Sequence, residues 1–341
     1  MEKQARKAPD FLNHAVLYQL FLRPFTPEGT FASAGRLLPH LKELGVDIIY
    51  LCPVNEADGD PDPKFWSPRQ IQSGLHNPKN PYRIANYETI DAEYGSEEEF
   101  REFIQQIHAL GMRIIMDFVY FHCGPTCTLI REHPDYVKLG PNGEVVNGPW
   151  CFPALNFDNP SLRRYLIGNM RHFVEDFGID GCRIDVGTTK IPLDFFVEAR
   201  KVLESIRPDI LMISESNCPD DQLEAFDVGY SPYGVRLMGI FEGKETTAAM
   251  SEVRDWLRTN FPKGVRLLNF ADNHDVASDA GEKRFETLYG ADAKRAFLAA
   301  VFSFPGVPML YNGEESPTQT ATASSPTVFI REISRSTGRT A

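Results

Sequence analysis

Four acidic residues stand where chemistry is expected, at or just after the C-terminal ends of short apolar runs. Asp117 ends MRIIMD, Asp185 ends GCRID, Glu215 ends LMISE, and Asp275 follows LLNF. A single Asp in such a place is usually a helix cap or a turn residue. Four at equivalent positions are hard to explain as caps, because carboxylates gathered in one cleft raise one another's pKa and so cost free energy.

Glycoside hydrolysis is a chemistry that uses such a group of acids. One carboxylate must be ionised to act as nucleophile, while another stays protonated and donates to the leaving oxygen. Arg183 stands two residues before Asp185, on the same face of a strand, and can hold a neighbouring carboxylate ionised through charge-assisted hydrogen bonds. An ordinary salt bridge is the alternative for Arg183, and it is disfavoured because it would be buried.

Near-continuous apolar runs predict the strands that position these residues, because parallel strands covered on both faces have this pattern. We expect eight strands, of which 226–229 carries the weakest signal: 15–21, 46–52, 112–116, 181–186, 210–213, 226–229, 265–270 and 307–310.

Helical periods separate most of these strands. Ser96 and Glu99 have capping-box spacing ahead of an apolar face that ends at Gly111, and Asn159 with Pro160 opens a second helix. Further helices are expected at 32–44, 192–205, 246–260 and 292–302.

This alternation predicts an α/β fold, a (β/α)8 TIM barrel of about 250 residues plus insertions. A doubly wound open sheet is the alternative, but the Gly-rich turn that usually follows its first strand is absent. In a barrel the loops after the strands converge on one face, so the four acids would share a cleft.

The expected domains are a catalytic barrel at 1–120 and 159–315, a short inserted domain at 121–158 after the third strand, and an irregular tail at 316–341. A second insertion spans 53–91. The Ser/Thr-rich tail shows no helical period, so we expect an incomplete C-terminal end without the helix that would close the barrel.

The charge composition indicates which kinds of partner the protein can bind. The chain has 341 residues, with 35 Lys and Arg against 47 Asp and Glu, a formal net charge of −12. Phosphate backbones and anionic lipids would repel it, so we expect a neutral substrate and neither nucleic acid nor membrane as partner.

The chain has no apolar run of 18 residues and no signal-like N-terminus, so we expect a cytoplasmic protein. In that reducing compartment its six cysteines should be free thiols. The oligomeric state stays open.

Four segments together resemble the ordered signature regions of the alpha-amylase superfamily, glycoside hydrolase family 13. They are DFVYFH (117–122), GCRIDV (181–186), ISES (213–216) and FADNHD (270–275). NPYRIANYETIDAEYG (80–95) and FPGVPMLYNGEE (304–315) add support, so the resemblance covers roughly residues 15 to 315.

The resemblance implies a role for each acid. Asp185 would be the nucleophile, Glu215 the general acid and base, and Asp275 the carboxylate that stabilises the transition state. Arg183 would position Asp185, and Asp117 would be a buried supporting acid near Arg183.

The resemblance also implies sugar-binding residues. His122 and His274 would bind sugar hydroxyls, although a structural histidine is the alternative for each. Tyr82 would offer a ring face on which the sugar stacks, with Phe65 and Trp66 as competitors for that role.

The sequence departs from the family in three places. Phe121 stands where the family usually has Asn, commonly a calcium ligand, so a structural calcium is doubtful and we expect no metal or other cofactor. The inserted segment 121–158 is short for the family. After Gly313, nothing resembles the final helix or the antiparallel β domain that ordinarily follows.

We therefore expect a retaining alpha-glycosidase that acts on maltodextrin-like glucans or small alpha-glucosides through a covalent glycosyl intermediate. An oligosaccharide or glucoside substrate is the expected partner. A transglycosylase or isomerase on the same scaffold is one alternative, since the same carboxylates serve it. A non-catalytic carbohydrate-binding protein or a truncated inactive homologue is the other.

Overall fold

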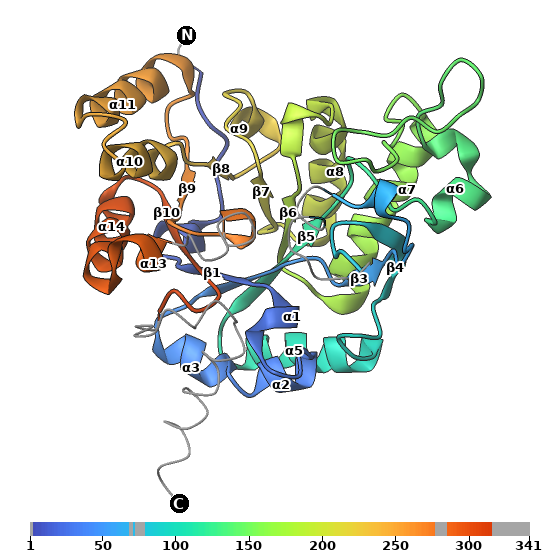
Figure 1. Ribbon diagram of the computed structural model, residues 1–341, viewed down its shortest axis with the longest axis horizontal. Coiled ribbons are helices and arrows are strands. Elements are labelled where there is room, and N and C mark those ends of the chain that lie inside the picture. The colour runs from blue at the N-terminus through green and yellow to red at the C-terminus, as the bar shows by residue number, and fades with distance from the viewer. Residues whose placement is uncertain (1–2, 68–70, 72–78, 277–284, 316–341) are drawn as a thin grey trace, which may run out of the picture.

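Eight parallel strands close into a barrel at the centre of the computed structural model, which describes residues 3–67, 71, 79–276 and 285–315. Their order around the barrel is β1-β10-β9-β8-β7-β6-β5-β2, and β1 pairs with β2 to close it (Figure 1). This confirms the predicted (β/α)8 architecture. The strands are β1 (Leu17–Leu20), β2 (Ile48–Leu51), β5 (Arg113–Phe118), β6 (Gly181–Ile184), β7 (Leu211–Ser214), β8 (Val228–Tyr230), β9 (Leu267–Asn269) and β10 (Val307–Tyr311).

The apolar runs form strands here because each barrel strand buries two faces. Alternate residues point inward and form one core cluster, with Leu17, Ile48 and Ile115 among its members. Intervening residues such as Ile49 and Ile114 point outward into the larger cluster under the helices. A strand with two buried faces reads as a continuous apolar run, which is why the sequence located all eight strands.

Most of the long helices lie where the sequence predicts them. Ser96 and Glu99 form the predicted capping box, with Ser96 Oγ accepting from the Glu99 amide at 3.2 Å and Glu99 Oε2 from the Ser96 amide at 2.8 Å. Asn159 caps the next long helix. The helices in the predicted places are α5 (Glu97–Ala109), α7 (Pro160–His172), α8 (Leu193–Ile206), α11 (Ala248–Asn260) and α14 (Ala291–Ser303).

The predicted helix at 32–44 is wrong in one respect, because it is split into α2 (Phe31–Gly35) and α3 (Leu38–Glu43). Pro39 lies in the first turn of α3, where its missing N–H is tolerated, whereas a helix that continued from α2 would need that N–H to donate to the Gly35 carbonyl. The sequence did not predict α10 (Tyr233–Phe241) or the short helices α1 (Leu22–Phe25), α6 (Thr128–Glu132), α9 (Asp221–Glu224) and α13 (Phe285–Tyr289).

The two insertions, of which the second contains α6, lie together on one side of the barrel (Figure 1). The helices α10, α11, α13 and α14 lie on the other side. The first insertion forms an unpredicted antiparallel pair, β3 (Asn55–Ala57) and β4 (Ile84–Ile90). The second contacts β4 through the Gly124 amide, which donates to the Ile84 carbonyl at 2.7 Å. The domain division stays a prediction, and the tail 316–341 lies outside the described residues.

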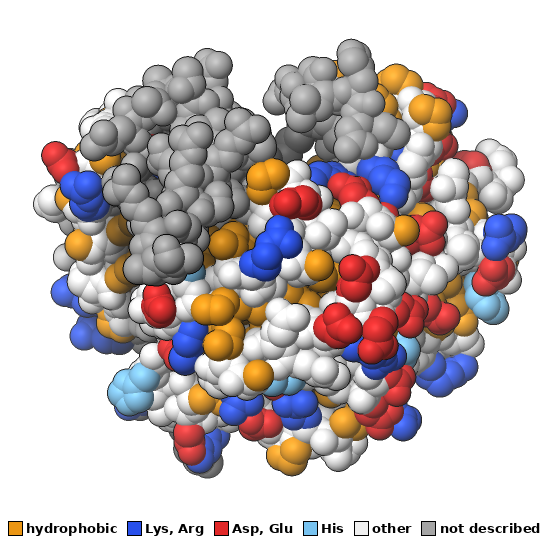
Figure 2. Space-filling view, turned by 90° about the horizontal axis from the view of Figure 1, so that it is seen from below, with side chains coloured by type: hydrophobic (Ala, Val, Ile, Leu, Met, Phe, Trp, Pro, Cys, Tyr) orange, Lys and Arg blue, Asp and Glu red, His pale blue; other side chains and the backbone are white. Residues whose placement is uncertain are grey.

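The distribution of surface charges and the state of the cysteines agree with what the amino-acid composition predicts. Figure 2 shows acidic and basic side chains interspersed over one face, with apolar side chains scattered between them. All six cysteines are free thiols, as expected. In the part of the chain that the structure describes, no helix is long and apolar enough to cross a membrane.

Gly181 opens β6 between two neighbouring strands, and we expect Gly181→Ala to destabilise the barrel. An added Cβ would lie 2.2 Å from the Leu211 carbonyl oxygen and 2.8 Å from Ile115 Cγ2. Overpacking of this kind typically lowers the free energy of unfolding by about 1–3 kcal/mol. Urea unfolding measures the change.

Gly168→Ala is the matched control, because Gly168 lies in α7 with nothing within 4 Å of an added Cβ. Alanine there should raise stability by up to about 1 kcal/mol, through helix propensity. Equal stability of the two variants would contradict the packing argument for β6.

Candidate active site

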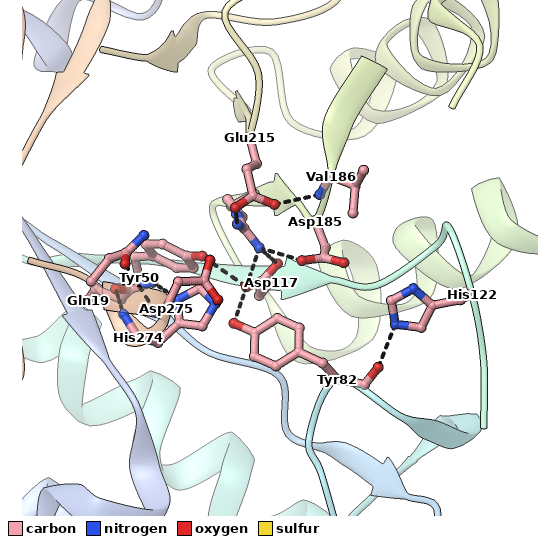
Figure 3. Close-up of polar contacts among 12 residues, drawn as sticks. Gln19, Tyr50, Tyr82, Asp117, His122, Asp185, Val186, Glu215, His274 and Asp275 are labelled. Atoms are coloured by element: carbon pink, nitrogen blue, oxygen red, sulfur yellow. Dashed lines mark hydrogen bonds and ion pairs between the residues drawn. The ribbon is translucent and has the colours of Figure 1, made fainter. Parts of the chain in front are cut away.

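The four acidic residues lie at one end of the barrel, where the strands finish. Asp117 belongs to β5, Asp185 and Glu215 directly follow β6 and β7, and Asp275 lies in a short helical turn after β9. Figure 3 shows Asp117, Asp185, Glu215 and Asp275 around a common space. Parallel pairing produces this arrangement, because it aligns the C-terminal ends of neighbouring strands.

A single buried guanidinium joins three of these carboxylates. Arg183 is fully buried on β6, and the strand register places it opposite Asp117. Its Nη1 donates to the two Asp117 oxygens at 2.8 and 2.7 Å, and to Asp185 Oδ1 at 3.2 Å. Its Nη2 lies 2.7 Å from Oε1 of Glu215, an ion pair without the angle of a hydrogen bond. One cation therefore holds acids from β5, β6 and β7 side by side.

Asp117 is fully buried and accepts four hydrogen bonds. Its Oδ2 also accepts from the hydroxyls of Tyr50 and Tyr82, each at 2.8 Å. Burial raises the pKa of each of these tyrosines well above its usual range, so they remain protonated donors. Asp117 is thus a fully buried hydrogen-bond partner that holds Arg183 in place.

Asp185 and Glu215 are less enclosed, with side chains 11% and 21% exposed. Burial raises the pKa of Asp185 well above its usual range, and the Glu215 charge adds to the effect while Arg183 opposes it. Burial likewise raises the pKa of Glu215, opposed by Arg183 and by the Val186 amide. The pair titrates as a unit and keeps a proton at pH values where free carboxyl groups have lost theirs.

The backbone turn after Asp185 is strained, and one of its amide groups donates a hydrogen bond to Glu215. Val186 has a φ of 62°, a left-handed conformation that is rare for a β-branched residue, and its amide donates to Glu215 Oε2 at 2.6 Å. Gly187 follows with a φ of 53°, and an added Cβ there would lie 2.3 Å from Ser214 Oγ. This turn fixes the direction of the Glu215 carboxylate.

A buried network of hydroxyl groups anchors that turn to the loop after β7. Asp221 accepts from Thr188 Oγ1 at 2.5 Å and from the Ser216 hydroxyl. Ser216 Oγ also lies 2.9 Å from Ser214 Oγ. Sequence reasoning missed these supporting residues, and the only signal for them is the pair of serines that flank Glu215.

Tyr82 and His274 form a stacked pair beside the carboxylates. Their ring centroids lie 4.8 Å apart with an interplanar angle of 7°, so one face of the Tyr82 ring is covered by the imidazole. His274 Nε2 lies 3.4 Å from Asp275 Oδ1, and Gln19 of β1 contacts His274 from the barrel interior. The sequence did not single out Gln19.

His122 lies beside the main chain of Tyr82, on the opposite side of the view from Asp275 and His274 (Figure 3). Its Nε2 is 2.8 Å from the Tyr82 carbonyl oxygen, and its ring packs against Trp150 and Phe152. Burial lowers the pKa of His122 to about 4, so the ring is neutral at pH 7, and its buried Nδ1 has no hydrogen-bond partner among the described residues.

The two competitors for the stacking role are engaged in their own turn. Trp66 donates Nε1–H to the Asp60 carbonyl at 3.3 Å, and the Lys64 ammonium lies 4.6 Å from the Phe65 ring centroid. Tyr82, by contrast, is tied directly to Asp117.

Phe121 occupies an apolar environment that does not suit a calcium ion. It is buried and packs edge-on against Trp150 and His122, and calcium prefers oxygen ligands. Within the described ranges, no group of three or more His, Cys, Asp or Glu side chains could hold a metal ion. We derive no step through a metal.

Comparisons with known proteins agree with the barrel fold. The family model described as alpha amylase, catalytic domain, matches residues 27–141. The chain is 26% identical to "Alpha-amylase MalA" of Haloarcula japonica over 90% of this chain and 45% of that protein. It is also 26% identical to a cyclomaltodextrinase of Geobacillus thermopakistaniensis over 91% of this chain and 57% of that protein.

A solved alpha-amylase from Lactobacillus plantarum has a similar structure, with a TM-score of 0.81 and 25% identity over 94% of this chain and 76% of that one. The chain spans about half the length of the curated relatives it matches.

The raised pKa of Asp185 predicts a pH-dependent gain in stability for Asp185→Asn. The folded state binds this proton more tightly than the unfolded chain, whose Asp has its ordinary pKa near 3.8. The wild type therefore loses stability as pH rises from about that value through the raised pKa, and an uncharged Asn does not. Thermal unfolding should show a Tm gain that grows with pH, by about 1–2 °C for each kcal/mol at this chain length.

Asp292→Asn is the control, because its side chain is 96% exposed and no burial penalty is removed. That variant should show no Tm gain that grows with pH, because no buried carboxyl group is replaced. A Tm difference for Asp185→Asn that is flat, or that shrinks as pH rises, would contradict the stated electrostatics.

Proposed function

Because the chain belongs to the alpha-amylase superfamily, we propose that it is a retaining alpha-glycosidase. It cleaves alpha-glucosidic linkages of maltodextrin-like glucans or small alpha-glucosides through a covalent glycosyl–enzyme intermediate. The names of the relatives, an alpha-amylase and a cyclomaltodextrinase, support alpha-glucans as the substrate class.

The observation that carries this proposal is the contact of Arg183 with Asp117, Asp185 and Glu215. Asp117 balances the buried cation, which leaves Asp185 and Glu215 as a pair of neighbouring carboxyl groups that retains a proton. One ionised and one protonated carboxyl group are what a retaining glycosidase requires.

The first step forms the covalent intermediate. An oxygen of Asp185 attacks the anomeric carbon and forms a glycosyl ester, while the bond from that carbon to the leaving oxygen breaks. Glu215 gives its proton to that oxygen as it departs. The Val186 amide holds the resulting Glu215 carboxylate in place through a charge-assisted hydrogen bond.

The second step releases the sugar. Glu215 takes a proton from water, whose oxygen attacks the anomeric carbon from the side the leaving group vacated. The ester bond breaks, and Asp185 returns as a carboxylate beside Arg183. Two inversions give net retention of configuration.

The remaining site residues hold the sugar. Asp275, whose side chain is 31% exposed, accepts hydrogen bonds from hydroxyls of the ring that is cleaved, and His274 contacts the same ring. Tyr82 offers the face that His274 leaves open. His122, neutral and with an unpaired buried Nδ1, binds a hydroxyl near the inserted segment.

A transglycosylase or isomerase is the second candidate, because a sugar hydroxyl can replace water in the second step with the same carboxylates. Product analysis with and without an added acceptor sugar separates the two. Transfer products that dominate at low acceptor concentration would favour the second candidate.

Proton NMR of the first-formed product tests the stereochemistry. We expect the alpha anomer from a maltooligosaccharide, since double displacement retains configuration. Asp185→Asn should lower kcat by at least about 10³-fold, because it removes the nucleophile, and circular dichroism should show that the variant is folded. A beta anomer, or substantial turnover by Asp185→Asn, would refute the mechanism.

Gly187→Ala should reduce kcat by about 10- to 100-fold, because the added Cβ displaces the turn that directs Glu215. Gly111→Ala is the matched control, since Gly111 also has a positive φ, 69°, but has open space around it. Each variant should lose about 1–2 kcal/mol of stability from the left-handed backbone. Equal kcat values would show that the turn does not position Glu215.

A further inference from the structure

Gln19 forms a two-way contact with His274 from inside the barrel. It lies on β1, is fully buried, and is separated from His274 by 255 positions in the sequence. We propose that Gln19 is a positioning residue that fixes the tautomer of His274 and keeps the imidazole proton on Nε2.

The orientation of the Gln19 amide follows from a donor whose identity is certain. The backbone N–H of His274 can only donate, and it lies 3.1 Å from Gln19 Oε1. Turning the amide over would bring its NH2 group against that N–H, two donors facing each other. The oxygen therefore faces the backbone, and the NH2 group faces the imidazole.

The tautomer follows from the amide. Gln19 Nε2 lies 2.9 Å from His274 Nδ1, and an amide NH2 group has no lone pair to accept a proton donor. Nδ1 must therefore be the acceptor, so the neutral ring carries its proton on Nε2.

The surroundings direct that proton toward the cleft. The Tyr82 ring is stacked on the imidazole, and Nε2 lies 3.4 Å from Asp275 Oδ1, so Tyr82 and Asp275 are titratable groups that face the ring among the described residues. A sugar hydroxyl placed there would accept from Nε2–H and donate to Asp275. This use of the tautomer rests on the proposed function, whereas the tautomer itself rests on the hydrogen bonds alone.

A histidine-selective ¹⁵N long-range correlation spectrum tests the tautomer without any substrate. The chain has eight histidines, and the His274 signals are those lost in His274→Asn. At neutral pH the wild type should show an unprotonated Nδ1 and a protonated Nε2 for His274. A protonated Nδ1 would overturn the proposal.

Gln19→Glu is the informative variant, because it keeps the shape and replaces the donor with an acceptor. A carboxylate 2.9 Å from Nδ1 requires a proton between them, so Nδ1 should become protonated. A spectrum that matches wild type at His274 would show that Gln19 does not set the tautomer.

Gln222→Glu is the matched control. Gln222 is also buried, and its amide also bridges a backbone pair, donating to the Arg266 carbonyl at 2.7 Å and accepting from the Arg266 amide at 2.8 Å. The substitution should lower stability for the same reason, yet leave the His274 signals and kcat/KM unchanged. This separates a loss of fold from a change at the imidazole.

The kinetic readout concerns the sugar. With Nδ1 protonated, the ring either presents a lone pair to the sugar or, as a cation, pairs with Asp275, and each state removes the donor–acceptor pair that a hydroxyl bridges. We expect kcat/KM for a chromogenic alpha-maltoside to fall by about 10-fold or more. Altered His274 signals with unchanged kcat/KM would overturn the link to sugar binding. If the wild type cleaves no alpha-glucoside, the proposed function fails and the spectra still decide the tautomer.

Discussion

The buried charge of Arg183 is the constraint on which the site depends. Removing a guanidinium from water costs several kcal/mol, and only close carboxylates with good geometry offset that cost. Asp117 meets this need from β5, and burial of Arg183 is outweighed by Asp117 and Glu215, which raise its pKa well above its usual range. The register of β5 against β6 is therefore an electrostatic requirement as well as a matter of apolar packing.

The same interaction explains why the acids differ in behaviour although one cation contacts three of them. Asp117 is fully buried, and its two oxygens accept four hydrogen bonds, from Tyr50, Tyr82 and Arg183. The positive charge of Arg183 also lowers the pKa of Asp185 and of Glu215, and so opposes the effect of their burial. Burial raises the pKa of both carboxyl groups, and the Glu215 charge raises that of Asp185 further, so the pair retains a proton. The three carboxyl groups therefore behave differently because the groups around them differ.

The sequence was sufficient for the parts of the fold that follow from burial. Strands with two apolar faces and helices with capping signals appear where their patterns predict them. The β3–β4 pair was missed because β4, IANYETI, is polar and lacks the pattern of a barrel strand. The positive φ of Val186 could not be predicted, since a β-branched residue disfavours it and tertiary contacts impose it. Gln19 could be noticed in the sequence only as a polar residue inside an apolar run. Its contact with His274 could not be predicted, because the two residues are 255 positions apart.

A second buried arginine, Arg83, lies beside Tyr82 and links the two insertions. Arg83 is fully buried, and its guanidinium lies 3.3 Å from Asp58, which in turn accepts from the Thr126 amide at 2.7 Å. This chain of contacts joins the insertion after β2 to the one after β5. Arg83 directly follows Tyr82, so the charge that locks the two insertions together also fixes the ring that stacks on His274. The barrel strands position the carboxylates by means of their contacts with Arg183. The insertions position Tyr82 by means of the contacts of Arg83, its neighbour in the sequence. The Tyr82 hydroxyl on Asp117 is the point at which the two arrangements meet.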